Sequence, residues 1–232
     1  LLKPYHLDRA SLLPARALRL EGARDVLDLC AAPGGKSLLL ALRMPQEARL
    51  LTNDRSRERL GRLRRVLQEH LPEELLRRVE TAGQDAALWG RKRPESADAI
   101  LADVPCSSER HVLSSPPHLA DWSETRISRL GKQATGILAS AFDALRAGGS
   151  LVYSTCALSP VENDAVVARI LERRRERCEL QRPEAGELAE ICEGVLPVEA
   201  VEQTEHGYQI LPDRAEGSGP IYFARLRKGA EL

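Results

Sequence analysis

The chain has 232 residues, of which 43% are hydrophobic and 29% are charged, as in ordinary folded enzymes and unlike disordered or collagen-like chains. Its 34 Lys and Arg residues balance its 34 Asp and Glu residues, so the overall charge does not indicate a nucleic-acid or membrane binder. Aromatic residues make up only 3%, which argues against a protein that holds single-stranded nucleic acid by base stacking alone.

Short apolar runs alternate with longer helical patterns from the N-terminus onward, which predicts βαβ units and a mostly parallel sheet. Strands are expected at 25–29, 49–53, 78–81, 98–103 and 150–154, followed by an antiparallel closing pair at 208–211 and 220–225. Helices are expected from about residue 36, over 56–70, over 123–146 and over 160–177. The chain is thus predicted to be an α/β protein with a seven-stranded sheet and an antiparallel C-terminal strand. It is expected to consist of an N-terminal extension (1–20) and one larger domain (21–232).

Local signals predict helix ends in the second half of the chain. The pair Gly148–Gly149 predicts the end of the third helix. The stretch Ser159–Glu162 has the spacing of a capping box and predicts that the fourth helix begins at Pro160. Residues 107–122 lack periodicity and predict a loop over a strand end, while the acidic stretch 178–206 has no clear pattern.

The stretch DLCAAPGGKS, residues 28–37, follows the first strand and opens the first helix. It ends like a nucleotide-triphosphate loop, but that loop needs a glycine five residues before Gly35, and residue 30 is Cys. Without that glycine the backbone N–H groups cannot curl around a triphosphate. The stretch instead predicts a turn at which the backbone approaches a ligand that faces the helix N-terminus.

Three carboxylates, Asp54, Asp85 and Asp103, follow the ends of successive predicted strands. Asp54 comes 19 residues after Gly35, where doubly wound folds present a carboxylate to ribose hydroxyls. Because the full GxGxxG fingerprint is absent, a nucleoside ligand without phosphates is favoured, and the carboxylates suit the sulfonium of S-adenosylmethionine. Taken singly, an aspartate at a strand end is more often a turn former or a helix cap.

Cys106 follows the fourth predicted strand and Cys156 the fifth, so both thiols emerge at the ligand-binding edge if these strands are neighbours in the sheet. A single free cysteine is usually a small buried hydrophobe. Two thiols beside a methyl donor indicate covalent catalysis. Methylation of carbon 5 of a pyrimidine needs a thiolate together with the methyl donor, because thiolate addition at carbon 6 makes carbon 5 nucleophilic. Asp103 is then expected near ring nitrogen 3, where a carboxylate stabilises the developing charge.

Taken together, these motifs resemble the Nop/Sun (RsmB-like) family of S-adenosylmethionine-dependent RNA cytosine-5 methyltransferases. The residues that carry the resemblance are Cys30-Ala-Ala-Pro-Gly-Gly-Lys36, Asp54, Asp85, Asp103-Val-Pro-Cys106 and Ser154-Thr-Cys156. The resemblance covers essentially the whole chain and implies a Rossmann-like class I methyltransferase fold. It also implies Cys156 as the nucleophile and Cys106 as the thiol that assists release of the product. Within the family, Tyr5 to Leu18, PCSSERH and GPIYFARL are most similar to the mitochondrial small-subunit ribosomal RNA branch.

The predicted site therefore has a catalytic part and a cofactor part. The catalytic residues are Cys156, Cys106 and Asp103. The residues expected at S-adenosylmethionine are Cys30, Ala31, Ala32, Pro33, Gly34, Gly35, Lys36, Asp54, Asp85 and Asp103, with Lys36 at the methionine carboxylate. No metal site is expected, since no two of the five cysteines have CxxC spacing.

RNA is the expected substrate, with ribosomal RNA ahead of transfer RNA and the target cytosine flipped out or taken from a loop. The segment 1–78 carries 16 basic and 10 acidic residues. Its arginines 55, 57, 59, 62, 64 and 65 predict either a phosphate-facing surface or a solvated helix face. Arg110 of the 107–122 loop is expected to grip the base, and His111 either does the same or is a plain loop histidine.

Two other functions stay open at this point. An exocyclic-amine methyltransferase usually carries an aromatic residue where Cys106 stands. A non-catalytic RNA-binding or ribosome assembly factor on the same fold is opposed by the intact cysteine pair.

The odd number of cysteines indicates a reducing compartment. This is either the bacterial cytoplasm or, if an upstream targeting segment is missing, the mitochondrial matrix. No apolar run approaches the roughly 18 residues of a membrane span, so no membrane partner is expected. A monomer is expected. Because no additional RNA-binding domain is recognisable, a targeting protein, the ribosomal subunit or a lost N-terminal region is expected to select the substrate.

Overall fold

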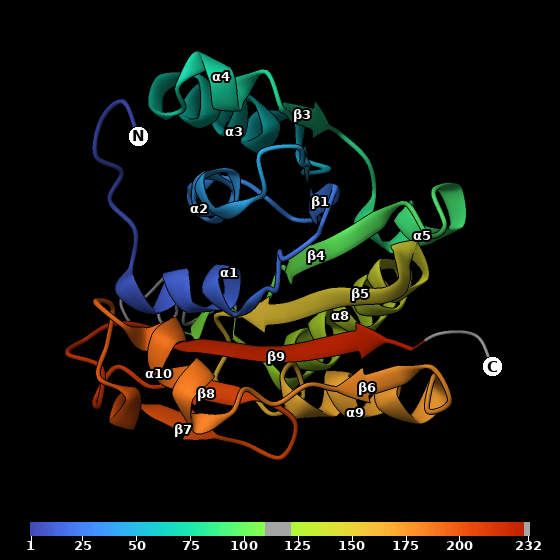
Figure 1. Ribbon diagram of the computed structural model, residues 1–232. Helices are drawn as coiled ribbons and strands as arrows, with labels where there is room; N and C mark the ends of the chain where they lie inside the picture. Colours follow the sequence, from blue (N-terminus) through green and yellow to red (C-terminus); the bar gives the residue numbers. More distant parts are fainter. Residues whose placement is uncertain (110–121, 230–232) are drawn as a thin grey trace.

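The computed structural model describes residues 1–109 and 122–229. One sheet runs through the molecule with helices on both of its faces (Figure 1). The strand order is β3-β2-β1-β4-β5-β9-β8-β7, and β6 pairs with β9 outside that path. The strands are β1 (Asp25–Asp28), β2 (Arg49–Asn53), β3 (Val79–Ala82), β4 (Ala97–Asp103), β5 (Leu145–Thr155), β6 (Cys178–Leu180), β7 (Val201–Gln203), β8 (Tyr208–Ile210) and β9 (Ile221–Lys228).

The pairing of the strands confirms the predicted α/β fold. Strands β3, β2, β1, β4 and β5 are parallel to one another, as expected for strands joined by helical crossovers. Strand β9 is antiparallel to β5, and β8 is antiparallel to β9, so the C-terminal strands close the sheet as an antiparallel extension.

Within the described residues the sheet has nine strands, where the sequence predicts seven. The two additional strands, β6 and β7, have three residues each and lie in the acidic stretch 178–206. Strand β6 pairs with the end of β9, at Lys228, while β8 pairs with its beginning, at Ile221. Strands of this length form because a neighbour offers an edge, which periodicity within the segment does not reveal.

Two helical layers bury the sheet. The helices are α1 (Leu13–Ala17), α2 (Gly35–Arg43), α3 (Arg57–His70), α4 (Glu73–Leu76), α5 (Trp89–Lys92), α8 (Glu124–Ala144), α9 (Asp164–Arg173) and α10 (Ala185–Cys192), with short 3-10 turns η1 (Arg9–Leu12), η2 (Ala86–Leu88) and η3 (Val198–Ala200). One core contains side chains of α1, α2, α3 and α10, and the other contains those of α5, α8 and α9. Neighbouring strand residues alternate between them, with Val26 and Val152 in the first core and Leu27 and Leu151 in the second.

Two predicted helix ends are wrong. Helix α8 ends at Ala144 and strand β5 begins at Leu145, so Gly148–Gly149 lies inside the strand, because Leu145 already pairs with Ala97 of β4. Helix α9 begins at Asp164, not at Pro160. The Glu162 side chain accepts a hydrogen bond from the backbone N–H of Ser107 on the loop after β4, so this tertiary contact takes up the carboxylate.

The first 20 residues pack against the rest of the molecule. Leu13, Ala15 and Leu18 are fully buried in the same core as α2 and α3. Helix α1 lies beside β5 and β9 (Figure 1). Among the helices that the structure describes, none has the length and apolar character of a membrane span.

Candidate functional site

The carboxyl ends of the five parallel strands bring the predicted site residues to one edge of the sheet. In strand order from β1 to β5, they are Cys30, Asp54, Asp85, Asp103 with Cys106, and Cys156. This placement follows from the parallel register of β1 with β2 and β4, and of β4 with β5. Residues far apart in the sequence therefore share one edge, as the sequence predicts.

A cavity of about 220 Å³ lies at this edge and is lined by three of the predicted cofactor residues, Cys30, Asp54 and Asp85. Helix α8 contributes Gln133 and Ile137 to its wall. The other lining residues are Leu29, Asn53, Arg55, Ser56, Arg59, Gln84, Ala86 and Pro105. Most of them adjoin a predicted residue in the sequence, which is the signal that could have found them. Gln133 and Ile137 belong to a distant helix and carry no such signal.

The two aspartates of this cavity also organise the local backbone. Asp54 is 4% exposed, its Oδ1 accepts a hydrogen bond from the backbone N–H of Ser56 at 2.9 Å, and its Oδ2 lies 3.4 Å from Nη1 of Arg59. Asp85 caps η2, with Oδ1 accepting from the N–H of Ala87 at 2.9 Å. Asp54 and Asp85 therefore do form a turn and a helix cap, as the alternative interpretation of a strand-end aspartate predicts, and both also line the cavity.

The two glycines of the turn face the protein itself. Gly34 has φ +122°, and a Cβ there would lie 3.1 Å from side-chain carbons of Leu63 and Val66 on α3. At Gly35 a Cβ would lie 2.9 Å from side-chain carbons of Tyr5 and Leu7. Glycine is therefore required here by close packing of α2 against α3 and against the N-terminal segment.

The remaining residues of the predicted cofactor set belong to the turn before α2, to the start of α2 and to the end of β4. Among the described residues, Ala31, Ala32, Pro33, Gly34, Gly35, Lys36 and Asp103 do not line the cavity. Arg59, which lines the cavity, also contacts the turn, because its Nη2 donates a hydrogen bond to the carbonyl of Ala32 at 2.6 Å.

The ammonium of Lys36 lies on Asp103, with Nζ 2.7 Å from Oδ2. Burial opposes the charge of Lys36, but the nearby carboxylate outweighs it and raises the pKa of Lys36. In this structure the two predicted residues therefore form one ion pair at the end of β4.

A further buried carboxylate, which the sequence prediction missed, lies next to this pair. Asp28 at the end of β1 is 1% exposed, and its Oδ2 accepts a hydrogen bond from the Ser37 hydroxyl at 2.7 Å. Its Oδ1 has no hydrogen-bond partner among the described residues. Burial raises the pKa of Asp28 to about 7, and the charge of Asp103 adds to that effect. Asp28 stands at a strand end, as Asp54 and Asp103 do, but nothing in the sequence shows that it is buried.

The two predicted catalytic thiols are in contact. The Sγ atoms of Cys106 and Cys156 are 3.0 Å apart, and the Ser108 hydroxyl lies 3.2 Å from Sγ of Cys156. Both cysteines are free thiols. The loops after β4 and β5 thus present two sulfur atoms and a hydroxyl to one point.

The surroundings of the two thiols favour a thiolate at Cys156. The hydrogen bond from Cys106 lowers the pKa of Cys156, and Ser108 and Lys36 act in the same direction, while burial opposes them. The same contact and burial raise the pKa of Cys106 well above its usual range. Burial also raises the pKa of Cys30. Among these three cysteines, only Cys156 is thus favoured as a nucleophile.

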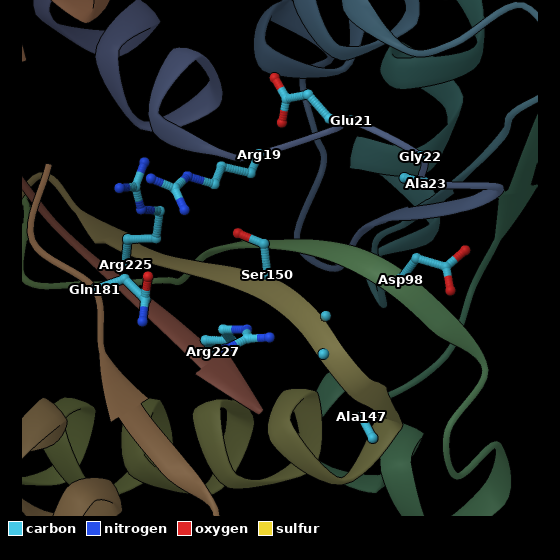
Figure 2. A pocket seen from close by; sticks show the side chains of 12 residues that line it. Arg19, Glu21, Gly22, Ala23, Asp98, Ala147, Ser150, Gln181, Arg225 and Arg227 are labelled. Atoms are coloured by element: carbon cyan, nitrogen blue, oxygen red, sulfur yellow. The ribbon is translucent and has the colours of Figure 1, made fainter. Parts of the chain in front are cut away.

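A larger cavity of about 620 Å³ lies at the opposite end of β4 and β5 (Figure 2). Arg19 and Arg225 are on one side of it and Asp98 is on the other. Glu187 accepts hydrogen bonds from Arg19 at 3.0 Å and from Arg225 at 2.9 Å. Oδ1 of Asp98 accepts from Arg146 at 2.8 Å, so structural ion pairs already engage these charges.

The predicted contacts of Arg110 and His111 with the substrate lie outside the described residues.

The chain matches a known family over most of its length. Residues 15–227 match the family described as 16S rRNA methyltransferase RsmB/F. The mitochondrial tRNA (cytosine(34)-C(5))-methyltransferase of Mus musculus is 35% identical over 230 residues, which cover 99% of this chain and 65% of that protein. The 5-cytosine rRNA methyltransferase NSUN4 of Xenopus laevis is 35% identical over 237 residues, which cover 97% of this chain and 56% of that protein.

The fold has a counterpart among solved structures. The crystal structure of NSun6 from Pyrococcus horikoshii with SFG superposes with a TM-score of 0.74 and 25% sequence identity. The superposition covers 98% of this chain and 53% of that one. The chain thus spans between about half and two thirds of the length of these similar proteins.

Proposed function

This chain belongs to the 16S rRNA methyltransferase RsmB/F family, and from that premise we propose that it transfers the methyl group of S-adenosylmethionine to carbon 5 of cytosine in RNA. The observation that carries the proposal is the contact between Cys106 and Cys156, whose Sγ atoms are 3.0 Å apart. The contact lies at the same sheet edge as the Gly-rich turn and the ion pair of Lys36 and Asp103. An exocyclic-amine methyltransferase has no use for two converging thiols.

The cofactor is assigned to the cavity lined by Cys30, Asp54 and Asp85. A carboxylate and an amide at the ends of β2 and β3 suit the hydroxyl and ring-nitrogen groups of an adenosine, and Ile137 offers an apolar wall. The similar NSun6 structure contains SFG, an analogue of S-adenosylmethionine, which supports the assignment. Bound there, the cofactor supplies an electrophilic methyl group.

Cys156 is assigned as the nucleophile. Its thiolate adds to carbon 6 of the cytosine, so that a sulfur–carbon bond forms and an electron pair becomes available at carbon 5. After methylation, water takes the carbon-5 proton, the carbon 5–carbon 6 double bond forms again, and the sulfur–carbon bond breaks with its electron pair returning to the Cys156 sulfur. The lowered pKa of Cys156 supports this order, because the free thiolate is both the attacking and the leaving species.

Cys106 and Asp103 are assigned supporting roles. Cys106 retains its proton more tightly than an ordinary thiol, donates a hydrogen bond to Cys156, and assists release of the product. Asp103 faces ring nitrogen 3 of the cytosine, where its carboxylate accepts a hydrogen bond from that nitrogen once the nitrogen takes up a proton from solvent, so the negative charge of addition does not build up in the ring. Lys36 holds that carboxylate at 2.7 Å and adds a positive charge near the Cys156 sulfur.

The substrate is assigned as RNA, with ribosomal RNA as the first candidate because the family and NSUN4 are both named for it. A phosphate-facing role is supported by Arg59 of helix α3 and by Arg55 just before it, which line the cofactor cavity, and by Arg57, Arg62 and Arg65 of α3, which continue the basic surface as exposed side chains. Transfer RNA is the second candidate, favoured by the name of the Mus musculus relative. The Mus musculus relative is named as mitochondrial, which supports the mitochondrion as one of the two expected compartments.

The test is transfer of a labelled methyl group from S-adenosylmethionine to ribosomal RNA and transfer RNA, with the methylated position mapped by bisulfite sequencing. Incorporation at cytosine carbon 5 is expected. Calorimetric titration with S-adenosylmethionine addresses the non-catalytic alternative, because an assembly factor without cofactor binding would release no heat.

A further inference from the structure

Two neighbouring residues before α9 hold both thiol-bearing loops. The carboxylate of Glu162 accepts a hydrogen bond from the backbone N–H of Ser107, next to Cys106, at 3.0 Å. The side chain of Asn163 accepts from the Thr155 hydroxyl at 2.6 Å and donates to the carbonyl of Ala157 at 3.0 Å. Thr155 and Ala157 are the two neighbours of Cys156, so consecutive side chains grip the loop after β4 and the loop after β5.

A second carboxylate ties the same two loops together. Glu109, on the loop after β4, accepts a hydrogen bond from the backbone N–H of Leu158 on the loop after β5 at 3.0 Å. The hydroxyl of Ser107 contacts both Glu109 Oε1 and Glu162 Oε2. Ser107 is 2% exposed, Glu162 1% and Glu109 8%, so water is largely excluded from this cluster.

The Ser107 hydroxyl has one proton for two carboxyl oxygens. If both carboxylates were ionised, one of the two contacts would bring a lone pair against a lone pair in a buried place, which is costly. One proton on a carboxyl group resolves this, because a carboxylic acid donates to Ser107 while Ser107 donates to the other carboxylate. The geometry therefore calls for a chain of two hydrogen bonds that runs from a carboxylic acid through a hydroxyl to a carboxylate.

We propose that Glu162 and Asn163 are positioning residues that set the spacing of Cys106 and Cys156, and that Glu162 does so as a carboxylic acid hydrogen-bonded through the Ser107 hydroxyl to Glu109. The role rests on the proposed function, since a set spacing of two thiols matters only if both take part in the reaction. It assigns a purpose to a buried group that the reaction itself does not use.

The groups around Glu162 agree with the location of this proton. Burial raises the pKa of Glu162, the hydrogen bonds from Ser107 oppose it, and the charge of Glu109 adds to it. Arg126 of α8 acts in the opposite direction. Tyr153 of β5 donates its hydroxyl to the Glu162 backbone carbonyl, so it does not compete for the carboxyl oxygens.

The positioning role predicts an effect on the reactivity of a thiol that Glu162 does not touch. The contact with Cys106 is the largest influence that lowers the pKa of Cys156. If the hydrogen bonds of Glu162 to Ser107 are lost, the two sulfur atoms separate and Cys156 loses the hydrogen bond from Cys106. Its thiolate should then form only at higher pH, even though every charged group near Cys156 is still present.

The experiment measures alkylation of Cys156 by iodoacetamide between pH 6 and pH 10, followed by mass spectrometry, in the protein without RNA. Glu162→Ala is expected to move the midpoint upward by about one pH unit and to lower methyl transfer on the order of 100-fold. Glu162→Gln is expected to restore the wild-type alkylation profile, because its amide donates to Ser107 and accepts from the Ser107 N–H as the carboxylic acid does. The control is Ile170→Ala, which opens the buried face of α9 without touching either loop.

Each outcome decides one part of the proposal. An unchanged profile in Glu162→Ala, with a loss of thermal stability like that of Ile170→Ala, overturns the positioning role. A profile in Glu162→Gln that matches Glu162→Ala overturns the shared proton. If Glu162→Ala does not fold, Ser107→Ala is the second variant and must show the same upward shift. The alkylation readout needs no RNA, so it stands even if the protein methylates none.

Discussion

The sulfur atoms of Cys106 and Cys156 are 3.0 Å apart although 50 residues separate them in the chain. Strands β4 and β5 are parallel neighbours whose carboxyl ends are in register, with Asp103 opposite Ser154. The loops that follow therefore start side by side, and Glu162 and Asn163 join them. The relationship couples the acidities of the two thiols, since the same contact lowers the pKa of Cys156 and raises that of Cys106.

The two thiols should fail in different ways when they are replaced. Cys156→Ala is expected to lower methyl transfer by at least about 1,000-fold, because the nucleophile is gone. Cys106→Ala should still form the bond to carbon 6 and accumulate a covalent protein–RNA adduct, visible on a denaturing gel. Wild-type turnover in Cys156→Ala would falsify the mechanism. A covalent adduct in that variant would mean that Cys106 is the nucleophile and Cys156 assists release.

The buried carboxyl of Asp28 should make stability depend on pH. Its pKa is raised to about 7, so the folded state holds this proton more tightly than the unfolded state. The stabilisation of the folded state by the protonated Asp28 carboxyl is therefore complete below the ordinary pKa range of aspartate, and it is lost as pH rises toward 7. Asp28→Asn cannot ionise, so its free energy of unfolding relative to the wild type should rise between pH 4 and pH 7, by up to about 4 kcal/mol.

Urea unfolding of the protein without ligands, at several pH values, measures this difference. Ser37→Ala serves as the matched control, because it removes the hydrogen bond that stabilises the ionised form of Asp28 and should shift the same window to higher pH. A difference between wild type and Asp28→Asn that does not change with pH contradicts the prediction.

The arginines of α3 should make RNA binding depend on salt. Arg57 and Arg65 are exposed on the helix that begins at the cavity lined by Cys30, Asp54 and Asp85. If both neutralise phosphates of single-stranded RNA, the double variant Arg57→Gln/Arg65→Gln should reduce the slope of log affinity against log salt by about 1.4. Fluorescence anisotropy over a range of KCl concentrations gives the slope. The control Arg173→Gln/Arg175→Gln removes two exposed arginines at the end of α9, and an equal change there would refute a role specific to α3.

The N-terminal segment should be sensitive to the size of residue 35. In Gly35→Ala the new Cβ would lie 2.9 Å from carbons of both Tyr5 and Leu7, which is too close without movement. A loss of about 1–3 kcal/mol in the free energy of unfolding is expected from this overpacking. Adding Leu7→Ala should recover part of the loss, as chemical denaturation of the double variant can show. Additive losses would mean that the two positions are not in contact.

Much of the candidate site could be predicted because each motif stands at a strand end. Asp54, Asp103, Cys106 and Cys156 all follow apolar runs, and parallel strands must place such residues on one edge. The cavity wall from α8 and the buried Asp28 were not predictable in this way. Gln133 and Ile137 belong to a helix whose position over the sheet depends on packing, and Asp28 differs from an ordinary turn aspartate only in its burial.

By itself, the sequence determined the parallel strands, the edge of the sheet that carries the site and the two cysteines that follow strands ending there. It could do so because alternating apolar runs and helical patterns leave few ways to build a parallel sheet with right-handed crossover connections. Only the tertiary structure decided the partners of Glu162, the strand that runs through Gly148–Gly149 and the contact of the two sulfur atoms. These features depend on side chains brought together from distant segments, where a carboxylate that could cap its own helix instead bonds to a loop across the sheet edge.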